Sequence, residues 1–179
     1  MKTPAHVVDI FLQPGEWYFG DRDTRIRTVL GSCVSLTAWH PKLKIGCMCH
    51  YMLPSRGKNK ALTLDGRYAD EALALLAREM RAAGTEPRDY QIKLFGGGHM
   101  FSGQVCLKNQ SHVSYRNTEA ARALTAQYGL SIAAENMGGV GHRNIIFDVW
   151  SGDVWVKHHQ GATPDQCGRC DVRQQCGLR

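Results

Sequence analysis

Several features that would place the protein in a particular class are missing from the sequence. No apolar run is long enough to cross a membrane, and the N-terminus lacks the apolar segment of a secretory signal peptide. These absences favour a cytoplasmic location. Internal repeats and an internal linker are also missing, and the composition shifts only near the C-terminus. We therefore expect one domain over residues 1–158 and a cysteine-containing tail over residues 159–179.

A concentrated basic patch is likewise absent. The 22 Lys and Arg residues outnumber the 16 Asp and Glu residues and give a net charge of +6. They are scattered, however, and no Lys/Arg run is interleaved with aromatic residues, as nucleic-acid recognition normally requires. The sequence favours a mildly basic surface, which would also suit an acidic partner such as a helix rich in Glu.

The cysteine content does not indicate a disulfide framework. Seven cysteines are an odd number, so at least one is unpaired, and cytoplasmic cysteines are normally thiols. Cys47 and Cys49 lie two positions apart in a predicted strand, on the face opposite Met48 and His50. We interpret these two cysteines as core thiols.

Nine short segments have the β-branched, aromatic or turn-flanked pattern of strands, and they do not alternate regularly with helices. This distribution predicts an α+β fold rather than a doubly wound one. The predicted strands are residues 7–12, 16–19, 25–30, 33–39, 44–52, 91–95, 131–137, 144–150 and 153–157.

Two segments have helical periodicity. The first carries apolar residues at helical spacing from Ala69 to Met80 and stops at Gly84. In the second, Asn117 is predicted to be the N-cap and Gly129 to end the helix.

The chemically most suggestive feature is a cysteine on a tight turn, Gly31-Ser32-Cys33, at the start of an apolar run. His50 follows, just before a segment that ends at Pro54. A thiolate is the nucleophile of thiol hydrolases, and a nearby histidine is the side chain best suited to remove its proton. Backbone N–H groups at such a turn can also stabilise an oxyanion. Residue types alone leave open a buried structural cysteine and a structural histidine.

The motifs around this pair resemble those of the CheD family, the chemoreceptor glutamine deamidases. They occur in family order from about residue 7 to residue 157, which makes the resemblance specific. The matching segments are residues 28–36, 50–54, 68–73, 93–101, 116–117, 137–143 and 151–154.

The resemblance implies a deamidase domain of stacked mixed β-sheets flanked by helices, with a cysteine-hydrolase-like arrangement. It implies that Cys33 is the nucleophile and His50 the base. The implied reaction converts glutamines of methyl-accepting chemotaxis receptors to glutamate through a thioester and releases ammonia. No metal or organic cofactor is implied, whereas a CheC-type phosphatase is implied as a second partner.

The third active-site residue of the family is a threonine shortly before the cysteine. Thr28 is the threonine available, but the family spacing points to Arg27, which could not take that role. We assign the position to Thr28, whose hydroxyl could orient the imidazole, with an ordinary strand residue as the alternative.

Two other segments carry chemical groups. Gly96-Gly97-Gly98-His99 lacks the residues of a phosphate-binding loop, and we expect a close-packed turn beside the active site. The role of His99 is open. The polar segment 55–63 is expected to be an exposed loop, either simply solvated or guiding an acidic receptor helix.

The tail contains half of a possible zinc site, and metal binding, redox sensing and a flexible reduced tail all remain open for it. The residues in question are Cys167, Cys170 and Cys176, with His158 and His159 upstream.

A rival interpretation of the whole chain is an adaptor that binds receptors or the phosphatase, with deamidation secondary.

Overall fold

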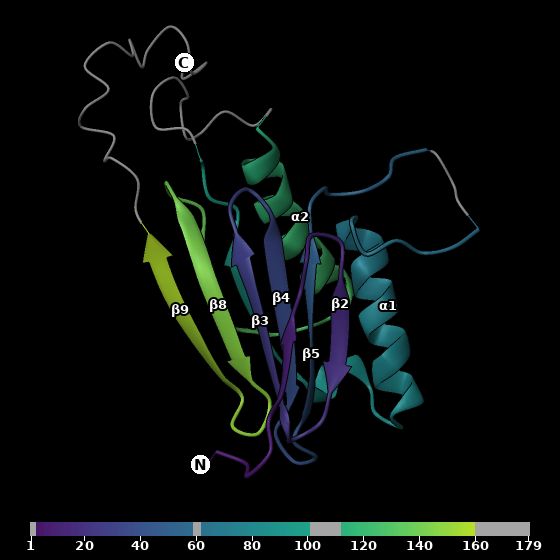
Figure 1. The fold of residues 1–179 in the computed structure, drawn as a ribbon. Coiled ribbons are helices and arrows are strands. Elements are labelled where there is room, and N and C mark those ends of the chain that lie inside the picture. Colours follow the sequence, from purple (N-terminus) through teal and green to yellow (C-terminus); the bar gives the residue numbers. More distant parts are fainter. Residues whose placement is uncertain (1–2, 59–61, 101–111, 160–179) are drawn as a thin grey trace, which may run out of the picture.

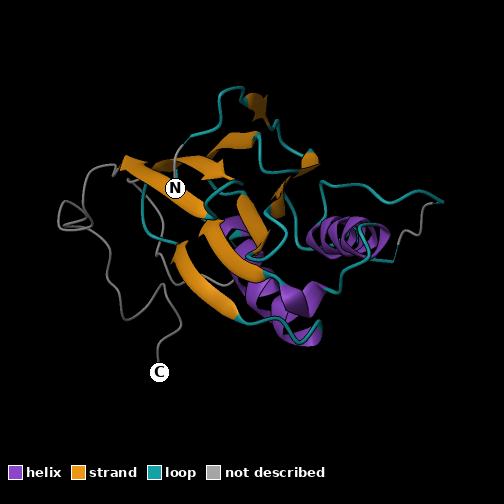
Figure 2. Cartoon of the chain, turned by 90° about the horizontal axis from the view of Figure 1, so that it is seen from below, coloured by secondary structure: helices purple, strands orange, loops and turns teal. Residues whose placement is uncertain are grey.

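In the computed structural model, two β-sheets stack face to face and two helices cover the outer face of one of them (Figures 1 and 2). The structure describes residues 3–58, 62–100 and 112–159. The first sheet has four strands in the order β1-β3-β8-β9, and the second has five in the order β2-β5-β4-β6-β7. The strands are β1 (Val8–Phe11), β2 (Trp17–Gly20), β3 (Thr24–Leu30), β4 (Val34–His40), β5 (Ile45–Tyr51), β6 (Gln91–Gly96), β7 (Ile132–Met137), β8 (His142–Asp148) and β9 (Asp153–His159). The helices are α1 (Ala69–Ala82), α2 (Val113–Gln127) and the short 3-10 helix η1 (Pro87–Asp89).

Both sheets are mixed, as predicted. β1 pairs with β3 in parallel and β6 pairs with β7 in parallel, whereas the remaining pairs are antiparallel. The α+β class is therefore confirmed. The helices cover only the five-stranded sheet, and the outer face of the four-stranded sheet exposes Phe11 and Trp155.

β4 and β5 form the centre of the molecule because both of their faces are buried. Cys47 and Cys49 face the helices and are completely buried in the core there, while Met48 lies in the core between the sheets. The interpretation of these two cysteines as core thiols is confirmed. The alternation that puts them on one side puts His50 on the other, between the two sheets.

The second helix begins earlier than the sequence predicts. α2 starts at Val113 after the N-cap residue His112, so Asn117 lies inside the helix, where it is fully buried. The prediction of Asn117 as an N-cap was therefore wrong. A buried polar side chain in a helix interior needs hydrogen-bond partners, and local sequence does not reveal that those of Asn117 lie outside the helix.

Candidate active site

Cys33 lies in the turn between β3 and β4, and this turn is at the upper end of the sandwich in Figure 1. Cys33 directly precedes β4, whose residues Val34 and Ser35 pair with Tyr51 and His50 at the end of β5. The half-buried Cys33 packs against the core between the sheets, and His50 lies on the same side. The pairing of β4 with β5 therefore brings Cys33 and His50 to the same end of the five-stranded sheet.

His50 is held from across the sandwich by Thr28 of β3. Thr28 Oγ1 lies 2.7 Å from His50 Nδ1 and donates a 2.8 Å hydrogen bond to the carbonyl oxygen of Leu12. A hydroxyl has one proton, and the carbonyl can only accept, so Oγ1 must accept the proton of Nδ1–H. This network assigns the Nδ1–H tautomer and leaves Nε2 with a free lone pair. Among the described residues, Nε2 is buried and has no hydrogen-bond partner.

Arg27, the competitor of Thr28 for the third position, points away from this site. Its side chain is 42% exposed on the outer face of the four-stranded sheet and forms a 2.7 Å ion pair with Asp9. Strand alternation explains the difference, because neighbours in a strand face opposite sides. The structure thus brings Thr28, and not Arg27, to His50.

Burial sets the protonation of the pair. Removal of water lowers the pKa of His50 to about 4, although the Leu12 carbonyl and the Glu16 carboxylate act in the opposite direction. Burial also raises the pKa of the Cys33 thiol, partly offset by its own backbone N–H. Both shifts favour uncharged forms, so at neutral pH the resting pair is a thiol and a neutral imidazole. A neutral imidazole is the form that can accept a proton as a general base.

The glycine loop (Gly96–Gly98) is the close-packed turn that the sequence predicts. Gly97 N–H donates to the carbonyl of Cys33 at 2.8 Å, and Gly98 N–H donates to the carbonyl of Gly31 at 2.8 Å. Gly96 has φ +110°, and a Cβ there would lie 2.3 Å from the Cys33 carbonyl oxygen. Only glycine allows this approach without displacing the backbone of the cysteine turn.

His99, whose role the sequence left open, follows the glycine loop and contacts the elements beside it. Its Nε2 lies 3.1 Å from Ser114 Oγ, and its backbone forms a bridge with Val140. These contacts tie the glycine loop to α2 and to the turn between β7 and β8.

Asn117 is the residue near the site that sequence reasoning missed. Its Nδ2 donates to the carbonyl of Ser32 at 3.0 Å and to the carbonyl of Met52 at 2.8 Å. It therefore contacts both the cysteine turn and the segment that follows His50. The signal that could have found it is a polar residue on the apolar face of a helix.

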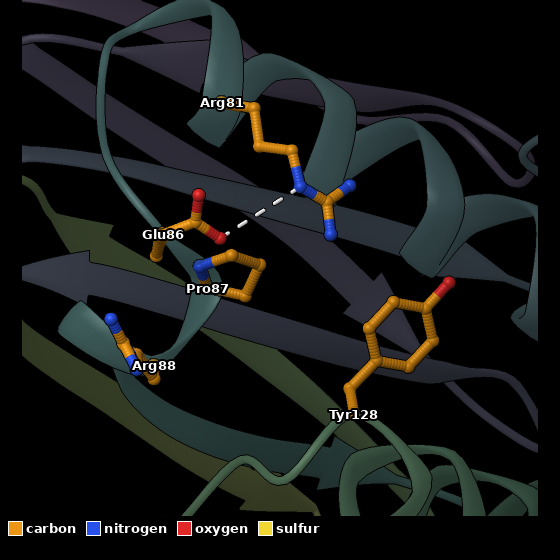
Figure 3. Close-up of a pocket in the computed structure, with 5 residues that line it drawn as sticks. All are labelled: Arg81, Glu86, Pro87, Arg88 and Tyr128. Atoms are coloured by element: carbon orange, nitrogen blue, oxygen red, sulfur yellow. Dashed lines mark ion pairs between the residues drawn. The ribbon is translucent and has the colours of Figure 1, made fainter.

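Two surface hollows lie outside the pair itself. One of about 320 Å³ lies at the C-terminal end of α1, where Arg81 Nε is 3.9 Å from Glu86 Oε2 (Figure 3). Because the N-terminal end of α1 is the end joined to Leu53, this hollow is remote from Cys33. The other, of about 190 Å³, lies beside the glycine loop and is lined by Gly97, His99, Ser114, Tyr115, Thr118, Glu119, Arg122, Met137, Gly138 and Gly139.

The basic loop after His50 is less free than the sequence indicates. Arg56 donates from Nε and Nη2 to the Glu71 carboxylate, each at 2.7 Å, so this cation is paired within the protein. Residues 59–61 of the loop lie outside the described residues.

The metal-binding, redox and flexible-tail hypotheses concern cysteines of the C-terminal tail. Cys167, Cys170 and Cys176 lie outside the described residues. Within residues 3–58, 62–100 and 112–159, no group of three or more His, Cys, Asp or Glu side chains could hold a metal ion, and Cys33, Cys47 and Cys49 are free. In the same part of the chain, no helix is both long and apolar enough to span a membrane.

A cysteine, a neutral histidine and a histidine-orienting hydroxyl at one edge of an α+β sandwich are the components of a cysteine-dependent hydrolase. The chain belongs to the CheD family: the family model described as "CheD chemotactic sensory transduction" matches residues 52–158.

Relatives extend the similarity beyond that range. A protein of Pseudomonas savastanoi pv. phaseolicola named "Probable chemoreceptor glutamine deamidase CheD" is 52% identical over 158 residues, which cover 88% of this chain and 89% of that protein. A Dechloromonas aromatica protein named "Probable chemoreceptor glutamine deamidase CheD 3" is 47% identical over 160 residues, covering 89% of this chain and 93% of its own. A Leptospira interrogans protein named "Probable chemoreceptor glutamine deamidase CheD 1" is 39% identical over 160 residues, covering 86% and 95%.

Proposed function

We propose that the protein is a chemoreceptor glutamine deamidase in which Cys33 is the nucleophile, His50 the general base and Thr28 the residue that orients His50. The observation that carries the proposal is the contact between Thr28 Oγ1 and His50 Nδ1, because it leaves the lone pair of Nε2 available. Membership of a family whose relatives are named glutamine deamidases supports the choice of substrate.

The first half of the reaction forms a thioester. His50 Nε2 removes the proton of the Cys33 thiol as the sulfur attacks the carboxamide carbon of a substrate glutamine. The carbonyl oxygen becomes an oxyanion, for which backbone N–H groups of the Gly31–Cys33 turn are the candidate donors. The carbon–nitrogen bond then breaks, and the proton on Nε2 leaves with the nitrogen as ammonia.

The second half restores the enzyme. Water attacks the thioester carbon and gives one proton to His50 Nε2. The carbon–sulfur bond breaks, the sulfur regains that proton, and the glutamine has become glutamate. No oxidant, metal or organic cofactor takes part in this sequence of steps.

We further propose a cytoplasmic location and a CheC-type phosphatase as a second partner. Both follow from the family resemblance. Pull-down with a purified CheC-type protein tests the partner, and absence of binding at micromolar concentrations would contradict it.

The test of the enzymatic proposal compares the wild-type protein with Cys33→Ala. The two proteins are incubated with the cytoplasmic fragment of a chemoreceptor, and peptides are analysed by mass spectrometry. We expect conversion of specific glutamines and ammonia release with the wild type only, while both proteins bind the receptor. Binding without conversion by the wild type would instead support the adaptor alternative.

A further inference from the structure

The Gly31–Cys33 turn is held at three successive carbonyl groups. Gly98 N–H bonds the carbonyl of Gly31, Asn117 Nδ2 bonds that of Ser32, and Gly97 N–H bonds that of Cys33. Two of these donors belong to the glycine loop. The third is a side chain of α2, so the helix layer contributes directly to the geometry of the turn.

Asn117 differs from the other two donors because the same nitrogen also bonds the segment that directly follows β5, the strand of His50. Its second bond goes to the carbonyl of Met52, and Tyr51 Oη donates to the backbone carbonyl of Asn117 at 2.7 Å. Tyr51 and Met52 are the two residues that follow His50. One helical residue thus connects the position before the nucleophile with the two positions after the base.

The orientation of the amide follows from its surroundings. Carbonyl oxygens only accept hydrogen bonds, so the NH₂ end must face Ser32 and Met52. Asn117 Oδ1 is buried and has no hydrogen-bond partner in the described part of the chain. An unpartnered buried acceptor is unfavourable, and such groups are retained where another constraint requires the side chain. Here the two donated bonds are that constraint.

We propose that Asn117 is a positioning residue that fixes the Cys33 thiol relative to His50 Nε2 by tying the Ser32 and Met52 carbonyls to one amide. This inference rests on the proposed roles of Cys33 and His50. It assigns no contact between Asn117 and the substrate. Loss of the amide donors therefore slows the chemical step and leaves substrate binding intact.

Two substitutions separate the hydrogen bonds from the packing. Asn117→Asp keeps the shape of the side chain but cannot serve both carbonyl oxygens, because an ionised carboxylate donates no hydrogen bond and a protonated carboxyl donates only one. Asn117→Ala removes both the hydrogen bonds and the packing of the side chain. The matched control is Thr125→Val, because Thr125 is equally buried on α2 but bonds only carbonyls of its own helix.

The measurements are kcat and KM with a chemoreceptor cytoplasmic fragment, the rate of Cys33 alkylation by iodoacetamide at neutral pH, and the melting temperature. Misplacement of reacting groups by about 1 Å can cost on the order of 100-fold in rate, so we expect kcat to fall about 10- to 100-fold in both Asn117 variants. KM is expected to stay near the wild-type value. Alkylation slows toward the rate of His50→Ala, because the imidazole is no longer held where it can take up the thiol proton.

The Thr125→Val control distinguishes a positioning role of Asn117 from a general contribution of buried α2 residues to stability. If Thr125→Val lowers the melting temperature as much as Asn117→Asp does but keeps kcat and alkylation rate, the proposal stands. Wild-type kcat and alkylation rate in folded Asn117→Asp, or equal losses in Thr125→Val, would overturn it. An active Cys33→Ala protein would instead contradict the proposed function, so the two failures are distinguishable.

Discussion

Thr28 determines which nitrogen of His50 is available for chemistry. Its hydroxyl proton is committed to the Leu12 carbonyl, and its oxygen accepts from Nδ1–H, so the ring is fixed in one tautomer and one orientation. The sequence alone could not settle this role, since Arg27 and Thr28 competed for the position. The alternation of β3, with Thr28 inside and Arg27 outside, distinguishes the two residues.

Substitution of Thr28 by Val tests this arrangement. The variant keeps the shape of the side chain but leaves the Leu12 carbonyl and His50 Nδ1–H buried without partners, at a cost of about 1–3 kcal/mol each. We expect kcat for deamidation to fall by on the order of 10- to 100-fold, because the imidazole is no longer fixed. Thr28→Ser retains the hydroxyl and is expected to keep most of the activity. Equal activities of the Val and Ser variants in a deamidation assay would exclude the orienting role.

At the scale of elements, the glycine loop and the β3–β4 turn contact each other directly through backbone hydrogen bonds. The sequence identified the glycine segment as a turn because of its composition, and the strands because of their residue types. It could not identify which elements donate to the cysteine turn, since those bonds join residues far apart in the chain. Asn117 is the clearest case: its local pattern resembles a helix cap, whereas its partners come from the β3–β4 turn and from the segment after β5, both distant in sequence.

Gly96→Ala tests the contact between loop and turn. Its new Cβ would lie 2.3 Å from the Cys33 carbonyl oxygen, so the backbone of the turn must move. The control is Gly129→Ala, because Gly129 also has a positive φ, of +65°, but nothing lies within 4 Å of its Cβ position. Both variants are expected to lose about 1–2 kcal/mol of stability from the unfavourable backbone conformation.

Only Gly96→Ala is expected to lose most of its deamidase activity as well. Measurement of unfolding free energy beside kcat for the two variants separates these effects. Full activity in folded Gly96→Ala would show that the close approach has no part in positioning Cys33.

At the scale of the whole molecule, the site depends on both sheets. His50 lies in the five-stranded sheet, Cys33 lies in the turn that joins the two sheets, and Thr28 reaches His50 from the four-stranded sheet. The sequence predicted stacked mixed sheets through the family resemblance. It did not reveal that β1 and β2 enter different sheets, because strands separated by a short turn ordinarily pair with each other.

Burial of His50 between the sheets couples its protonation to folding. Its pKa is about 4 in the folded protein, below the ordinary histidine value of 6.5, so the unfolded chain binds the proton more tightly. The neutral ring's full stabilising contribution is present above pH 6.5 and is lost as the pH falls toward 4. We expect this loss to be on the order of 3 kcal/mol, and His50→Gln to lack it. Urea unfolding of both proteins across this range is the measurement, and parallel pH profiles would contradict the assignment.

The most direct test of the account is mass spectrometry of receptor peptides after incubation with the wild type, Cys33→Ala and His50→Ala. The account predicts glutamine-to-glutamate conversion at specific positions with the wild type, none with Cys33→Ala, and a strongly reduced rate with His50→Ala. Unchanged glutamines with the wild type, or equal conversion by all three proteins, would contradict it.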